Sequence, residues 1–74
     1  MSAAPEKVEI VLNDRPHELA APATLLAVLG GLGLAGRSGV AAAVNGEVVP
    51  RGLWETRALA RRDRVVVIRA TQGG

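Results

Sequence analysis

The sequence closes on two glycines, Gly73 and Gly74, which follow Ala70-Thr71-Gln72. A free terminal carboxylate is ionised at neutral pH and is therefore a poor acyl electrophile. Activation by ATP as an acyl-adenylate would make it reactive, and the acyl group could then pass to sulfur or nitrogen. A tail that enters such an active site must be slim, which glycine allows. The alternative is a frayed end, since termini are often disordered and glycine is the least ordered residue.

Three other features could carry chemistry, and each has a plainer structural interpretation. Gly31 to Gly36 matches the pattern G-x-G-x-x-G, but these glycines follow an expected helix, whereas the dinucleotide fingerprint precedes one. His17 is the only histidine and cysteine is absent, so neither a metal site nor a catalytic triad can be assembled. Trp54, the only aromatic residue, is expected to fill the core, and the alternative is that it faces a partner. We therefore expect no catalytic residues and no bound metal.

Length and composition limit the classes of function. Seventy-four residues form one domain with a modest core, too small for separate substrate and cofactor domains. A binding module or a protein co-substrate without a bound cofactor fits this size. Cysteine is absent and Met1 to Val11 lacks the order of a signal peptide, so a cytoplasmic protein is expected. The uncharged stretch Leu19 to Gly36 is interrupted by Pro22 and four glycines, so we expect no membrane partner.

Charge is distributed unevenly along the chain. Residues 1–50 carry a net charge of −2 and residues 51–74 a net charge of +4. A basic C-terminal third favours a partner with an acidic surface or a polyanion. The plainer interpretation is a solvated surface rich in arginine. Because the chain lacks Phe and Tyr for stacking on bases, no nucleic-acid partner is expected.

The first part of the chain predicts a β-hairpin. Apolar and polar residues alternate from Val8 to Leu12, as in a strand with one buried face. Asn13 to Pro16 predicts a turn, and His17 to Leu19 resumes an extended run.

A helix follows, with Thr24 as its N-cap and with Leu25, Leu26, Val28 and Leu29 on its apolar face. Gly30-Gly31 is expected to end the helix in left-handed conformations. Gly33 to Gly39 is expected to form a flexible loop.

The second half predicts another hairpin and a closing strand. Val40 to Val44 is a strand block, and Asn45-Gly46 favours a type I′ turn before a partner strand that ends at Pro50. An irregular connection follows, with apolar anchors at Leu53, Trp54 and Leu59. The fold class is therefore α+β, with one helix packed across a small mixed sheet.

The last strand, Arg64 to Arg69, contains the unbroken apolar run Val65 to Ile68 and is therefore expected in the middle of the sheet. One helix covers only one face, so two of its apolar residues stay exposed. We expect Val66 and Ile68, bordered by Arg64 and Arg69, to form a partner surface.

The order of elements and the terminal glycines resemble the ubiquitin-like β-grasp sulfur carriers, and most closely the ThiS family of thiamin biosynthesis. The matching segments are the opening strand with its Asn13-Asp14 turn, Ala43 to Arg51 (AVNGEVVPR) followed by Trp54, and the closing strand into Ala70-Thr71-Gln72-Gly73-Gly74. The Val-Pro-Arg-x-x-Trp block with the Gly-Gly end is fairly specific. The resemblance covers nearly the whole chain.

The resemblance implies a protein co-substrate rather than an enzyme. A ThiF-type adenylyltransferase would consume ATP to adenylate the terminal glycine, and a sulfur donor enzyme would supply the sulfur of a thiocarboxylate. That sulfur would pass to a ThiG-type thiazole synthase for thiazole formation. Gly74 would carry the adenylate and then the sulfur, and Gly73 and Gln72 would belong to the narrow tail.

The sequence departs from the family pattern in two places. The family has Asp-Gly-Asp or Glu-Gly-Asp before the last strand, where this chain has Arg61-Arg62-Asp63. A left-handed Arg62 would cost about 1 kcal/mol relative to glycine. The extension before Val8 is also atypical. We expect a disordered extension over residues 1–7, a β-grasp domain over 8–70 and a flexible tail over 71–74.

Other functions on the same fold remain open from sequence. The small subunit of molybdopterin synthase uses the same terminal chemistry, but more aromatic residues would be expected near its tail. Carriers for tRNA or other thiolation, and protein modifiers, are further alternatives. An RNA-binding β-grasp module such as a TGS domain is favoured only by the arginines, and it predicts salt-sensitive binding.

Overall fold

Two hairpins and a closing strand build the sheet. The computed structural model describes residues 7–70, so the expected tail over 71–74 and nearly all of the expected N-terminal extension lie outside the described residues. Within that range the elements are β1 (Lys7–Leu12), β2 (Arg15–Ala20), α1 (Leu25–Gly31), β3 (Val40–Val44), β4 (Glu47–Val49), the 3-10 helix η1 (Arg51–Leu53) and β5 (Arg64–Arg69). The order of elements and the α+β class are as expected from the sequence.

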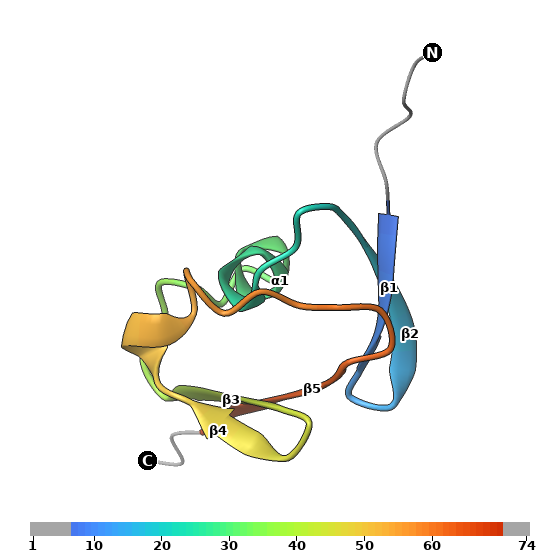
Figure 1. The fold of residues 1–74 in the computed structure, drawn as a ribbon. Helices are drawn as coiled ribbons and strands as arrows, with labels where there is room; N and C mark the ends of the chain where they lie inside the picture. Colours follow the sequence, from blue (N-terminus) through green and yellow to red (C-terminus); the bar gives the residue numbers. More distant parts are fainter. Residues whose placement is uncertain (1–6, 71–74) are drawn as a thin grey trace.

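β5 lies in the middle of the five-stranded sheet, as its apolar run predicts. The strand order is β2-β1-β5-β3-β4, with β5 parallel to β1 and antiparallel to β3. The helix α1 lies over one face of this mixed sheet (Figure 1). On that face Val65 is buried, together with Ile10 and Val44 of the neighbouring strands. The core therefore lies between α1 and the middle of the sheet.

Both hairpins turn through two residues with positive φ. Asn13 and Asp14 have φ values of 49° and 69°, and Asn45 and Gly46 have values of 52° and 84°. Such pairs form the type I′ turn that suits the twist of a hairpin. The first turn is shorter than expected, because these two residues already reverse the chain, and Arg15 and Pro16 belong to β2. The proline is tolerated there because β2 is an edge strand.

The start of α1 agrees with the sequence-based prediction. The Thr24 hydroxyl accepts a hydrogen bond from the Ala27 backbone N–H at 3.1 Å, which satisfies one of the free donors of the first turn. Among the described residues, no helix combines the length and apolarity needed to cross a bilayer.

The end of α1 differs from the expectation. Gly30 and Gly31 are helical, and the left-handed residue is Gly33, with a φ of 75°. The Leu34 N–H donates to the Leu29 carbonyl at 2.8 Å, and the Gly33 N–H donates to the Gly30 carbonyl at 3.0 Å. These two bonds form a Schellman motif, in which the buried Leu34 and Leu29 supply the apolar contact. The helix continues past the first glycines because this contact requires Leu34 to reach the core.

Trp54 fills the core, as expected for the only aromatic residue. Its side chain is 1% exposed, and its indole Nε1 donates to the Val49 carbonyl at 2.9 Å. Leu59 is also buried, but Leu53, expected as a third anchor, is 53% exposed. The η1 turn directs Leu53 outward while the adjacent Trp54 points inward, so one large side chain occupies the space under this connection.

The turn before β5 has the left-handed arginine that the sequence suggested. Arg62 has a φ of 68°, and its N–H donates to the Glu9 carbonyl at 2.8 Å. Asp63 closes the turn, since its carboxylate accepts from the Ala60 N–H at 2.8 Å and its own N–H donates to the Ala60 carbonyl at 3.0 Å. The turn therefore places the start of β5 beside β1.

Candidate functional site

The sheet face that α1 leaves uncovered carries apolar side chains on three neighbouring strands. Val66 and Ile68 of β5 are 45% and 59% exposed, and Val48 of β4 is 71% exposed. Ala43 pairs with both Val48 and Val66, and Ala41 pairs with Ile68. Because paired residues share a face, these side chains form one surface, which we call the open-face patch (Ala41, Ala43, Val48, Val66, Ile68).

Val48 was absent from the sequence-based surface. A signal for it existed, because a two-residue Asn45-Gly46 turn sets the register of the hairpin and so places Val48 opposite Ala43. What the sequence could not supply was the position of β3 beside β5, which brings the hairpin next to Val66.

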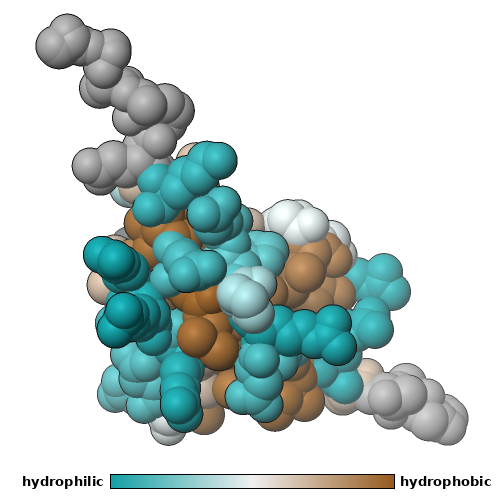
Figure 2. Space-filling view, turned by 90° about the vertical axis from the view of Figure 1, so that its right-hand side faces the viewer, coloured by the Kyte–Doolittle hydropathy of each residue, from teal (hydrophilic) through white to brown (hydrophobic). Residues whose placement is uncertain are grey.

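The part of the sheet formed by β1 and β2 is different in character. Glu9 lies opposite Glu18, and both are exposed on the uncovered face. Seen from the side of this hairpin, hydrophilic side chains cover much of the surface, with hydrophobic ones between them (Figure 2). The uncovered face therefore changes from charged at β1 and β2 to apolar at β5, β3 and β4.

The two arginines expected to border the partner surface lie on opposite faces of the sheet. Side chains alternate along a strand, so Arg64 shares the face of Val66 and Ile68, whereas Arg69 belongs to the other face. Arg69 pairs with Val40 and lines a cavity of about 440 Å³, together with Arg37, Ser38, Val40 and Ala70. The structure thus brings Arg64 together with Val66 and Ile68, and it separates Arg69 from them.

The end of β5 is held close to the residue that precedes β3. The Ala70 N–H donates to the Gly39 carbonyl at 2.6 Å. Gly39 has a φ of 76°, and a Cβ atom there would lie 3.4 Å from the Ala70 Cβ atom. We call Gly39, Arg69 and Ala70 the tail root, because Thr71 to Gly74 continue from it. Gln72, Gly73 and Gly74, the expected tail and sulfur-carrying residues, lie outside the described residues.

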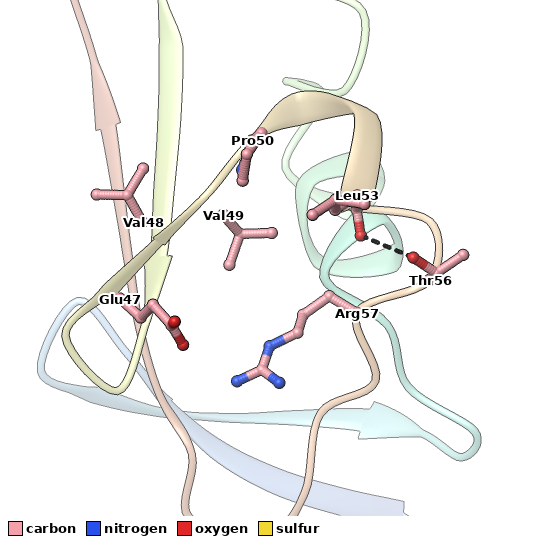
Figure 3. Close-up of a pocket in the computed structure, with 7 residues that line it drawn as sticks. All are labelled: Glu47, Val48, Val49, Pro50, Leu53, Thr56 and Arg57. Carbon is pink, nitrogen blue, oxygen red and sulfur yellow. Dashed lines mark hydrogen bonds between the residues drawn. The ribbon is translucent and has the colours of Figure 1, made fainter.

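A shallow groove lies beside β4. It has a volume of about 240 Å³ and is lined by Glu47, Val48, Val49, Pro50, Leu53, Thr56 and Arg57. Figure 3 shows Val49 and the Arg57 side chain between β4 and the segment that follows η1, with Thr56 turned toward Leu53. The Thr56 hydroxyl donates to the Leu53 carbonyl at 3.3 Å. The lining combines the apolar side chains of Val48, Val49, Pro50 and Leu53 with the charged side chains of Glu47 and Arg57.

Titratable residues do not gather into a metal site within residues 7–70. No group of three or more His, Cys, Asp or Glu side chains is placed there to hold an ion. His17 lies in β2 opposite Ile10, and it is half-buried.

Comparison with known proteins gives a family match over almost the whole chain. The model of the ThiS family matches residues 6–74. The crystal structure of the thiamine biosynthesis protein ThiS from Geobacter metallireducens superposes with a TM-score of 0.69 at 23% identity, covering 90% of this chain and 100% of that chain. An NMR solution structure of a thiamine biosynthesis protein from the same organism gives a TM-score of 0.72 at 22% identity, covering 90% and 88%. These two likenesses show a shared fold. Among curated proteins, no match was found.

Proposed function

The chain belongs to the ThiS family, and from that premise we propose that it is a sulfur carrier whose Gly74 becomes a thiocarboxylate for thiazole formation in thiamin biosynthesis. The observation that supports this proposal most directly is the extent of the family match, which continues through Gly73 and Gly74. The shared fold with ThiS of Geobacter metallireducens agrees with it.

The proposed chemistry uses the chain as a co-substrate. In the active site of a ThiF-type adenylyltransferase, the Gly74 carboxylate attacks the α-phosphorus of ATP, and pyrophosphate leaves. A sulfur nucleophile at the oxidation level of sulfide, provided by a sulfur donor enzyme, then attacks the acyl carbon and displaces AMP, so that sulfur replaces one carboxylate oxygen. A ThiG-type thiazole synthase accepts this sulfur. ATP is thus consumed by the partner, and we propose that the sequence of reactions takes place in the cytoplasm.

Two parts of the chain have separate roles in this proposal. Gln72, Gly73 and Gly74 form the narrow segment that enters the partner's active site. The open-face patch, with Arg64 at its border, docks on the partner enzymes, because its apolar area bordered by charge has the composition of an interaction site. In this proposal catalysis belongs to the partner enzymes, and the chain supplies the carboxylate that they modify.

Intact mass measurement tests the proposal. The protein is incubated with ATP, a ThiF-type adenylyltransferase and a sulfur source, and the expected product has one oxygen replaced by sulfur. In Gly74→Val this product should fall at least a hundredfold, because a misplacement of about 1 Å at the reacting centre is enough for such a loss.

The melting temperature serves as the control. It should not change in Gly74→Val, since the core side chains of the described residues belong to positions 8–67. Sulfuration of Gly74→Val at the wild-type rate would show that the carrier assignment of Gly74 is wrong.

A further inference from the structure

Arg51, the first residue of η1, connects three parts of the molecule. Its guanidinium carbon lies 4.6 Å from the centre of the Trp54 ring. Its Nη1 donates to the Ala35 carbonyl at 2.7 Å, and its Nη2 donates to the Arg37 carbonyl. A planar guanidinium is suited to this arrangement, because its parallel donors reach two acceptors while its face rests on an aromatic ring. The ring itself is fixed, since Trp54 is buried and hydrogen-bonded to Val49.

The segment held by Arg51 leads directly to the tail root. Two residues after Arg37 the chain reaches Gly39, whose carbonyl accepts the Ala70 N–H at 2.6 Å. Figure 1 shows the segment after α1 passing beside η1 on its way to β3. The left-handed φ of Gly39 and the absence of a Cβ atom permit its close approach to Ala70.

These contacts form a continuous connection from the core to the end of β5. It runs from Trp54 to Arg51, then through the carbonyls of segment 35–37 to Gly39, and finally to Ala70. Without the guanidinium, the carbonyls of Ala35 and Arg37 lose these partners and bond to water instead. Segment 35–39 would then hold Ala70 less firmly, because exposed loops with few internal hydrogen bonds open locally at low cost.

We propose that Arg51 is a positioning residue for the chemistry at Gly74: it holds segment 35–39 against Ala70 and so fixes the end of β5, from which the sequence continues to Gly74. The effect of Arg51 on the reaction at Gly74 rests on the proposed function. The claim that Arg51 holds segment 35–39 against Ala70 rests only on the contacts described above. Positioning matters because a reacting group displaced by about 1 Å reacts about a hundredfold more slowly.

The first test is amide hydrogen exchange at Ala70. Arg51→Lys keeps the positive charge but replaces the two-pronged donor by a single ammonium. We expect the Ala70 amide to exchange about tenfold faster or more in this variant than in the wild type. The Val67 amide, held by the Asn13 side chain at 2.8 Å, should keep its rate and so report that the domain is folded. Arg15→Lys, an exposed arginine of the edge strand β2, is the matched control.

The second test separates positioning from docking. With a ThiF-type adenylyltransferase, Arg51→Lys should lower kcat for thiocarboxylate formation about tenfold or more while KM for the carrier stays within about twofold, since the open-face patch is untouched. Gly39→Ala, which strains the same connection from the other side, should have the same effect on kcat and on Ala70 exchange.

The outcomes are distinguishable from failure of the proposed function. If the wild-type protein is never sulfurated, the carrier function fails, and the Ala70 exchange rates still decide the structural part. Wild-type exchange at Ala70 in Arg51→Lys, or a higher KM with unchanged kcat, overturns the positioning role.

Discussion

Arg62 shows how a single residue limits the stability of this small domain. Its left-handed backbone conformation (φ 68°) closes the turn before β5, and an L-residue with a side chain adopts it at a cost. The hydrogen bond from its N–H to Glu9 belongs to the backbone and does not depend on the side chain. The hydrogen-bonded backbone around Arg62 therefore holds this residue in a strained conformation.

Arg62→Gly should stabilise the protein. The substitution relieves a strain of about 1 kcal/mol, partly offset by the greater freedom of glycine in the unfolded chain. For a domain of this size we expect the melting temperature to rise by a few degrees, up to about 8 °C. Thermal unfolding measures the change. Arg61→Gly is the control, because Arg61 is not among the residues with positive φ and should lose stability on the same substitution. A lower melting temperature in Arg62→Gly would contradict the strain argument.

At the level of elements, the two hairpin turns do more than reverse the chain, since each contributes an asparagine that supports β5. The Asn13 side chain accepts from the Val67 N–H at 2.8 Å and donates to the Val67 carbonyl at 3.3 Å. The Asn45 side chain accepts from the Arg64 N–H at 2.9 Å. Asn13 thereby continues the pairing of β5 beyond the end of β1, so the central strand is supported along its length.

Asn13→Gly separates the side-chain hydrogen bonds to Val67 from the role of residue 13 in the turn. Glycine adopts the positive φ freely, so the turn remains, but two hydrogen bonds to Val67 are lost. We expect the free energy of unfolding to fall by about 1 kcal/mol, the net contribution of such bonds at an exposed site. Chemical denaturation measures it. Asp14→Gly, the same substitution at the other turn residue, is the control and should leave stability unchanged or raise it. Equal denaturation midpoints for the two variants would show that the Asn13 side chain contributes nothing to stability.

At the scale of the whole molecule, the sheet has two different faces, and its uncovered face has two parts of different character. One face packs on α1, and the uncovered face is charged at β1 and β2 and apolar over the open-face patch. β5 carries Ile68 of the patch and ends at Arg69, which belongs to the tail root. In the proposed function, a partner that binds the patch therefore contacts the strand that ends at the tail root.

Val66→Asp should weaken binding to the adenylyltransferase while leaving the fold intact. Val66 is 45% exposed and lies next to Ala43 in the patch, so a charge there remains solvated in the free protein but is desolvated in a complex. We expect the Kd to rise at least about tenfold, because a charge buried in an apolar contact costs more than about 1.4 kcal/mol, the free energy of a tenfold change. Titration calorimetry measures the affinity, and circular dichroism checks the fold. Ala20→Asp, at an exposed position of the edge strand β2, is the control. Unchanged affinity in a folded Val66→Asp variant would show that the patch is not part of the interface.

The sequence by itself determined the local elements. Alternation placed the first strand, Asn45-Gly46 specified a type I′ turn, and Thr24 capped the helix. The unbroken apolar run Val65 to Ile68 identified the central strand. The resemblance to the ThiS family, confirmed by the match over residues 6–74, rested on motifs in the same elements. These features depend on residues within a few positions of one another, so backbone preferences and side-chain periodicity suffice to predict them.

Only the tertiary structure decided the features that depend on contacts between distant segments. The helix passes Gly30 and Gly31 because the core accepts Leu34, and Leu53 points outward because Trp54 occupies the space beneath η1. Arg51 contacts carbonyls 14 and 16 residues earlier in the chain, and Asn13 bonds to a residue 54 positions later. No local preference specifies such partners. The packing of the folded chain selects these partners, because buried polar groups need hydrogen-bond partners and each large side chain needs space in the core.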